Sequence, residues 1–77
     1  MEIKILVFGI AKDILGKQTI KVTFETPATV KTVKAFLSLK YPTLPDFMVA
    51  VNGKYAKDNK KINPRDEIAI IPPTNGG

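Results

Sequence analysis

The residues that offer the most specific chemistry in this chain are its last two, Gly76 and Gly77. They follow the pair Pro72-Pro73 after a spacer of two residues. Because glycine has no Cβ, a terminal pair can enter a channel that is too narrow for other residues. Proline lacks a backbone N–H and keeps a chain extended, and four further residues span about 13 Å. We therefore expect residues 74–77 to be a flexible arm that carries the Gly77 carboxylate into another protein.

A terminal carboxylate is ionised at neutral pH and is a poor electrophile, so it must be activated before a nucleophile can react at its carbon. The chain has few groups that could activate it, since Cys and His are absent, Ser38 is the only serine, and no GxxxxGK[ST] phosphate loop occurs. The seven acidic residues are scattered and predict no metal site. We therefore expect a protein that is acted on by an ATP-dependent partner, rather than an independent catalyst.

Length and composition indicate one small globular domain. The 77 residues are 44% hydrophobic and 25% charged, and no apolar run approaches the ~18 residues of a membrane span. We therefore expect a cytoplasmic protein with no membrane partner. The net charge of +5 comes from eleven lysines and one arginine, and only Lys60 and Lys61 are adjacent. Nucleic-acid sites usually combine clustered arginine with aromatic side chains, so we expect a solvated lysine surface and no nucleic-acid partner.

The first part of the chain predicts two paired strands. Residues 2–8 alternate as a strand that has apolar side chains on both faces, with Ile3, Ile5 and Val7 on one face and Lys4, Leu6 and Phe8 on the other. Residues 11–15 predict one short helical turn that ends at Gly16. Residues 17–24 predict a second strand, and the short link indicates an antiparallel pair. The core-facing side chains of this second strand are Ile20, Val22 and Phe24.

One main helix is predicted between Thr29 and Pro42. Thr29 is a suitable N-cap, and Val33, Phe36 and Leu37 recur at helical spacing on one side. Pro42 ends the pattern because the residue before a proline is disfavoured in helical angles.

The rest of the chain predicts three further strands. Asn52-Gly53 indicates a tight hairpin turn, since both residues tolerate positive φ. The last apolar run is unbroken, which is typical of a strand at the centre of a sheet. The predicted elements are strands over 47–51 and 54–56, a polar loop over 57–61, a type I turn over 63–66 and a last strand over 67–71.

The order strand, strand, helix, strand, short strand, strand predicts an α+β protein. One helix would cross one face of a mixed sheet of about five strands, with the first and last strands as central neighbours. This is the β-grasp arrangement of ubiquitin, and we expect it to occupy residues 1–73.

Four segments carry a family resemblance that runs the length of the chain. The end reads DEIAIIPPTNGG, the start reads KILVFG from residue 4, and DILG and AVNG begin at residues 13 and 50. On these segments the chain resembles the small subunits of molybdopterin synthase, the MoaD-type sulfur carriers of the ubiquitin-like family. It departs from the family at Pro64-Arg65, where Asp-Gly is usual. It also has Lys31 near the helix N-cap, where an acidic residue is frequent.

The resemblance implies a non-catalytic, sulfur-donating subunit in molybdenum cofactor biosynthesis. An E1-like adenylating enzyme, with its own ATP, would convert Gly77 to an acyl-adenylate. A sulfur donor protein would then replace AMP and leave a C-terminal thiocarboxylate, which is a 1-thioglycine. In a heterotetramer with two large synthase subunits, that sulfur would attack the pterin precursor. No cofactor is expected on this chain itself.

The strand assignments leave one face of the sheet without a helix. Leu6, Phe8 and Ile71 would share this face, and an exposed apolar patch often marks a binding surface. The resemblance implies that this face docks the large subunit and, at another time, the adenylating enzyme; a Phe8 that folds over the core edge is the alternative. Lys12 matches a basic position of the family near that contact, although a solvated lysine would look the same. The implied partner-binding residues are Leu6, Phe8, Lys12, Ile71, Pro72, Pro73, Thr74 and Asn75.

Three other functions are compatible with parts of the sequence. A ubiquitin-like modifier would join Gly77 to lysines of target proteins, and some archaeal carriers that resemble this family do both. A thiamin-thiazole sulfur carrier shares the fold and the diglycine, but not usually the Pro-Pro pair. A basic RNA-binding module is the weakest alternative, and its binding would fall steeply with salt.

Overall fold

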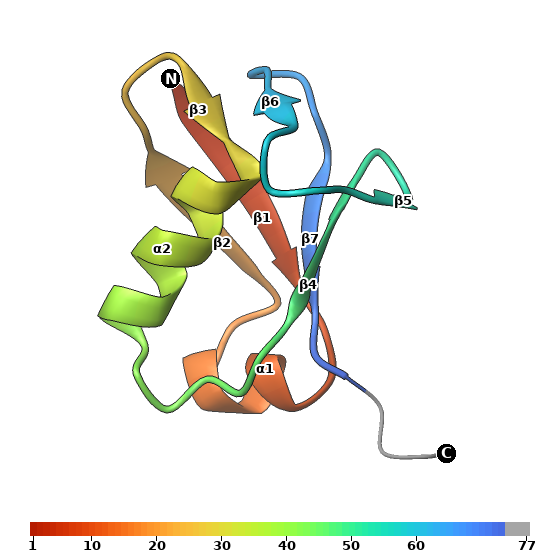
Figure 1. The fold of residues 1–77 in the computed structure, drawn as a ribbon. Coiled ribbons are helices and arrows are strands. Elements are labelled where there is room, and N and C mark those ends of the chain that lie inside the picture. Colours follow the sequence, from red (N-terminus) through yellow and green to blue (C-terminus); the bar gives the residue numbers. More distant parts are fainter. Residues whose placement is uncertain (74–77) are drawn as a thin grey trace.

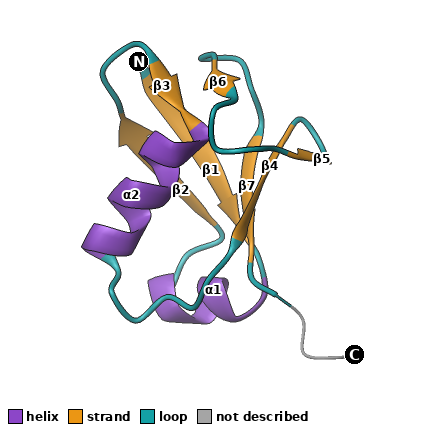
Figure 2. Ribbon diagram, in the orientation of Figure 1, coloured by secondary structure: helices purple, strands orange, loops and turns teal. Residues whose placement is uncertain are grey.

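A computed structural model describes residues 1–73. In chain order the elements are β1 (Glu2–Val7), α1 (Gly9–Leu15), β2 (Thr19–Thr23), β3 (Ala28–Thr29), α2 (Val30–Lys40), β4 (Met48–Val51), β5 (Lys54–Tyr55), β6 (Lys61–Ile62) and β7 (Ile68–Ile71). Five strands form one mixed sheet in the order β2-β1-β7-β4-β5 (Figure 1). The helix α2 crosses one face of this sheet, and β3 pairs with β6 at one end of the molecule (Figure 2). The α+β class and the mixed five-stranded sheet are confirmed.

The two central strands are β1 and β7, as the sequence predicts. They run parallel, with Leu6 opposite Ala69 and Val7 opposite Ile70. β2 pairs antiparallel with the outer side of β1, and β4 pairs antiparallel with the outer side of β7. Because β7 is bonded on both sides and packed on the core face, an unbroken apolar sequence suits it.

The core lies between the sheet and α2. The alternation in β1 directs Ile3 and Ile5 to this side, and Ile68 and Ile70 of β7 join them with no exposed surface. The helix contributes a fully buried stripe. Burying each of these aliphatic side chains contributes about 1.5–3 kcal/mol, so the core is the main source of stability. The helical stripe consists of Val30, Val33 and Leu37.

The start of α2 is held by its own N-cap region and by a distant loop. The backbone N–H of Thr29 donates to Thr32 Oγ1 at 3.0 Å, which is half of a capping box. The N–H of Val30 donates to the carbonyl of Lys60 at 2.9 Å, and that of Lys31 donates to Asp58 at 3.0 Å. The first helical N–H groups therefore have partners from residues 58–60, which the sequence did not reveal.

The helix α1 and Phe8 differ from the sequence-based expectation. Seven residues, Gly9–Leu15, are helical where one short turn was predicted, and Gly16 ends the helix in the left-handed region with φ +74°. Phe8 does not extend β1: it is the extended N-cap residue of α1. The cause is local, since Gly9 adopts φ +61° and turns the chain directly into a helix that buries Ala11.

The small sheet formed by β3 and β6 was not predicted. Ala28 pairs with Ile62, and both are buried where they close the core beside the start of α2. The expected polar loop over 57–61 was therefore too long by one residue, because Lys61 already belongs to β6. Strands of two residues carry no period that a sequence pattern could show.

Asn52 does more than form the hairpin turn that its sequence predicts. It has φ +53° and is followed by Gly53 at φ +84°, as a turn of this type needs. Its side chain also accepts from the N–H of Glu67 at 2.9 Å and donates to Asp66 Oδ1 at 3.0 Å. A hydrogen bond from the N–H of Asn63, followed by the one from Asn52, holds the pKa of Asp66 below its ordinary value.

Candidate functional site

The sheet face opposite α2 carries a row of five side chains, one from each strand, of which the four on β1, β7, β4 and β5 are Leu, Ala, Ala and Tyr. Register places Thr19, Leu6, Ala69, Ala50 and Tyr55 side by side on β2, β1, β7, β4 and β5. We call the face that carries this row the bare face. The two alanines are only 5% and 8% exposed. The centre of the row therefore consists of small side chains, and the larger Leu6 and Tyr55 lie on either side of them.

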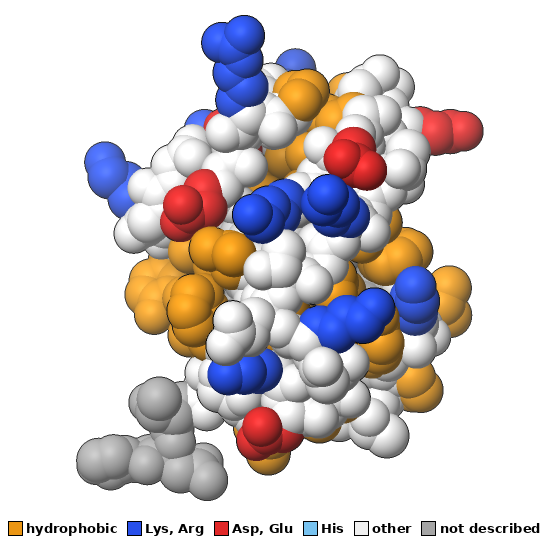
Figure 3. Space-filling view, turned by 180° about the vertical axis from the view of Figure 1, so that it is seen from behind, with side chains coloured by type: hydrophobic (Ala, Val, Ile, Leu, Met, Phe, Trp, Pro, Cys, Tyr) orange, Lys and Arg blue, Asp and Glu red, His pale blue; other side chains and the backbone are white. Residues whose placement is uncertain are grey.

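Larger apolar side chains stand on the flank nearest the last described residues. Ile71 of β7 is half-buried, and its β4 partner Met48 is 49% exposed. Tyr55 of β5 is 63% exposed. The view from behind shows hydrophobic side chains on the side where β4, β5 and β7 lie and also at the opposite edge, with basic side chains between the two groups (Figure 3). Large exposed apolar side chains such as Met48 and Tyr55 make this part of the bare face a candidate protein-binding surface.

The structure brings three of the expected partner-binding residues to one hollow. Leu6, Phe8 and Lys12 line a hollow of about 480 Å³ where β1 passes into α1. Phe8 is 49% exposed even though it no longer belongs to the strand. It therefore does not fold away into the core, and Lys12 supplies a positive charge beside it. Their role in binding a partner stays a prediction.

The two prolines at the end of β7 have different environments. Pro72 is buried, whereas Pro73 is exposed. The ring of Pro72 lies against Gly9, where a Cβ would come within 3.3 Å of Pro72 Cγ. Pro72 thus fixes the end of β7 to the start of α1, and its buried ring offers little surface to a partner. Thr74, Asn75, Gly76 and Gly77, on which the proposed chemistry depends, lie outside the described residues.

Sequence reasoning missed half of the bare face. Met48, Ala50 and Tyr55 were assigned to strands but not to a face, although they alternate with the core residues Val49 and Val51. The alternation was the available signal. It could not be applied because the register of β4 against β7 depends on a pairing between segments far apart in the sequence.

The geometry defines a class of protein. A five-stranded mixed sheet, one main helix and a central β7 that leads to the chain end are the features of a ubiquitin-like β-grasp protein. The structure is similar to that of SAMP1 from Haloferax volcanii, with a TM-score of 0.83, 24% identity and full coverage of both chains. It is also similar to a chain in the complex of subunits 1 and 2 of molybdopterin-converting factor from Helicobacter pylori, with a TM-score of 0.70, 22% identity and full coverage of both chains. At these identities the likenesses show the fold.

Sequence comparison goes further than the fold. Residues 5–77 match the family model described as the ThiS family. The chain is 33% identical over 81 residues to the molybdopterin synthase sulfur carrier subunit of Arabidopsis thaliana. The alignment covers all of this chain and 84% of that protein. The chain belongs to the ThiS family. In the described part of the chain, neither helix is long and apolar enough to span a membrane.

Proposed function

We propose that this protein is the sulfur-carrier subunit of molybdopterin synthase. The observation that carries the proposal is the full-length likeness to a sulfur carrier subunit of that synthase, at 33% identity. The fold supports it, because β7 leads directly from the bare face to Pro72-Pro73 and the terminal diglycine. The predicted absence of a cofactor on this chain, and a cytoplasmic location, remain part of the proposal.

The reactive group in this proposal is the carboxylate of Gly77. One of its oxygens attacks the α-phosphorus of ATP on an E1-like adenylating enzyme, and pyrophosphate leaves. The terminal sulfur of a persulfide on a donor protein then attacks the acyl carbon and displaces AMP, which gives an acyl disulfide. A second thiol cleaves its S–S bond, so that the thiocarboxylate leaves and a disulfide forms between that thiol and the donor. The carrier needs no cysteine for this, and it has none, because the transferred sulfur sits on the terminal carbonyl carbon. The chain is a co-substrate that is charged and discharged, so it does not act as a catalyst alone.

The partner that consumes the sulfur in this proposal is the large synthase subunit, in a heterotetramer with two carriers. The similarity to a chain from a complex of subunits 1 and 2 of molybdopterin-converting factor supports such a partner. We assign docking to the bare face and to the hollow lined by Leu6, Phe8 and Lys12. Ile71 and Pro73 continue this surface toward residues 74–77, which would enter the large subunit.

Reconstitution of molybdopterin formation tests the proposal. The full chain is charged with sulfur by the adenylating enzyme and a donor, then mixed with the large subunit and the pterin precursor. Molybdopterin should form with the full chain and should be lost when Gly76-Gly77 is deleted, because the deletion removes the reactive carboxylate. The deletion leaves the bare face unchanged, so a loss would not reflect an altered docking surface. Formation that is unaffected by the deletion would overturn the proposal. Diglycine remnants on cellular lysines, without molybdopterin formation, would instead support the protein-modifier function.

A further inference from the structure

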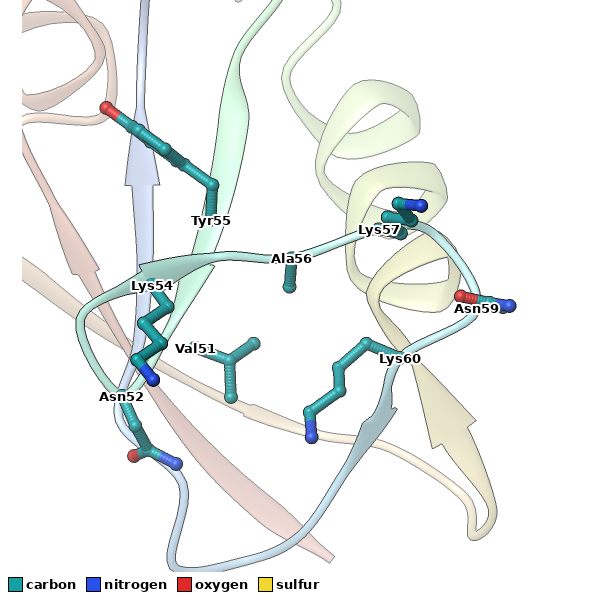
Figure 4. Close-up of a pocket in the computed structure, with 8 residues that line it drawn as sticks. All are labelled: Val51, Asn52, Lys54, Tyr55, Ala56, Lys57, Asn59 and Lys60. Carbon is teal, nitrogen blue, oxygen red and sulfur yellow. The ribbon is translucent and has the colours of Figure 1, made fainter.

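A second surface feature lies at the β4–β5 end of the sheet, away from the hollow at α1. A hollow of about 630 Å³ opens between the β4–β5 turn and the loop over residues 56–60 (Figure 4). Val51 and Ala56 supply apolar lining, and the basic side chains come from Lys54, Lys57 and Lys60. Lys54 and Lys60 extend on the two sides of Val51, whereas Lys57 points to the outside of the loop (Figure 4). We call this feature the basic hollow.

The two lysines beside Val51 in the basic hollow are not ion-paired in the described part of the chain. Asp58 is the only acid among residues 52–61, and its carboxylate is paired with Lys34 Nζ at 2.7 Å. Asp66 is the next nearest acid in the sequence. Its oxygens accept from Asn52 and Asn63, and the charge of Lys60 makes the smallest contribution to its lowered pKa. Within residues 1–73, neither Lys54 nor Lys60 forms an ion pair. Lys54 and Lys60 thus flank an apolar floor without a paired carboxylate among the described residues.

The loop that carries Lys60 is held in place by backbone hydrogen bonds at both of its ends. The N–H of Ala56 donates to Val49 at 2.9 Å, and the carbonyl of Lys60 accepts from Val30 at 2.9 Å. Within the loop, the N–H of Lys60 donates to the carbonyl of Lys57 at 3.0 Å. The hollow is therefore formed before any ligand arrives, so less ordering entropy is lost on binding.

The basic hollow lies around the edge strand β5 from the bare face. β5 is the edge strand of the sheet, and its two residues face opposite sides. Tyr55 pairs with Ala50 and belongs to the row on the bare face, whereas Lys54 pairs with Val51 and lines the basic hollow. A protein that covers the bare face and reaches past β5 would therefore meet Lys54 and Lys60.

We propose that the basic hollow receives an acidic segment of the large subunit when that subunit covers the bare face. This inference rests on the proposed function and adds an electrostatic contact to it. A Glu or Asp side chain suits the site, since its methylene groups can contact Val51 while its carboxylate lies between the lysines. RNA fits less well: the site has no arginine, and its one aromatic, Tyr55, belongs to the opposite face of the edge strand.

The test compares two pairs of substitutions that remove the same charge. Lys54→Gln/Lys60→Gln alters the basic hollow, and Lys17→Gln/Lys40→Gln alters exposed lysines elsewhere. Association of each full chain with the large subunit is timed by stopped flow at low salt and at ~1 M salt, where the Debye length is about 3 Å. Far-UV circular dichroism and urea midpoints check that both variants fold.

At low salt we expect the basic-hollow pair to associate on the order of three- to tenfold more slowly than wild type, with less than a twofold effect of the control pair. The difference should vanish at high salt. Equal effects of the two pairs, or none, would overturn the proposal, as would a loss of RNA binding with unchanged large-subunit association. Sulfur charging of Gly77 must stay intact in both variants; a wild-type chain that is not charged would refute the proposed function itself.

Discussion

The contact between Gly9 and Pro72 gives a stability prediction that can be worked from three glycines. Gly9, Gly16 and Gly53 all adopt positive φ, at +61°, +74° and +84°. Replacing any of them by alanine adds about 1–2 kcal/mol of left-handed strain. A gain of about 0.4–1 kcal/mol from the less flexible unfolded chain offsets part of this. Gly16→Ala and Gly53→Ala should therefore each lower the free energy of unfolding by about 1 kcal/mol, since neither new Cβ has a neighbour within 4 Å.

Gly9→Ala should cost clearly more than the two matched controls. Its new Cβ would lie 3.3 Å from Pro72 Cγ, and the buried Pro72 has little room to yield. Overpacking of this kind typically costs about 1–3 kcal/mol. We expect this overpacking cost in addition to the left-handed strain. The double variant Gly9→Ala/Pro72→Ala should lose less free energy of unfolding than the sum of the two single variants, because removing the ring relieves the contact.

Urea unfolding followed by far-UV circular dichroism measures all of these variants. The four chains of the cycle are wild type, Gly9→Ala, Pro72→Ala and the double variant, with Gly16→Ala and Gly53→Ala as controls. The reasoning is refuted if Gly9→Ala destabilises no more than Gly16→Ala, or if the two substitutions in the cycle are simply additive. Either result would mean that packing of Pro72 against Gly9 does not hold the end of β7 at the start of α1.

Three further predictions concern the core, the acidic turn and the docking surface. Leu37→Ala should lower the free energy of unfolding by about 2–5 kcal/mol in urea, since Leu37 is fully buried; a loss under 1 kcal/mol would contradict the packing. The lowered pKa of Asp66 adds stability above its unfolded pKa of about 3.9, and this is lost as pH falls through the folded value. In Asp66→Asn, the free energy of unfolding should therefore fall less steeply as the pH is lowered through the acid range. An unchanged pH dependence would contradict this role of Asp66. Phe8→Ala should weaken large-subunit binding about tenfold in calorimetry, whereas Leu39→Ala, on α2, should not; equal effects would remove Phe8 from the interface.

The strands that could be predicted from sequence are those whose patterns reflect their surroundings. The unbroken apolar run of β7 indicated a central strand, and the structure places it between β1 and β4. The alternation of β1 indicated apolar side chains on two faces, which assigned Ile3 and Ile5 to the core and Leu6 to the bare face. Asn52-Gly53 indicated its turn through a requirement for positive φ. In each case one local physical constraint was sufficient.

The features that could not be predicted depend on contacts between distant residues. The strands β3 and β6 have two residues each and exist because residues 28 and 62 meet over the core. The bridge from Asn52 to Glu67 joins segments fifteen residues apart. The lysines that looked dispersed include Lys54 and Lys60, which the β4–β5 turn and its following loop bring to one hollow. Local patterns do not contain these pairings, so neither the basic hollow nor the full bare face was visible in the sequence.

The central claim is that the Gly77 carboxylate becomes a thiocarboxylate, and the intact mass of the chain tests it most directly. The purified chain is incubated with the adenylating enzyme, ATP and a sulfur donor, and its mass is compared with that of a chain lacking Gly76-Gly77. We predict that the mass of the full chain rises by the difference between one sulfur and one oxygen atom, whereas the mass of the truncated chain is unchanged. A full chain whose mass does not change, while a known carrier is charged under the same conditions, would contradict the account.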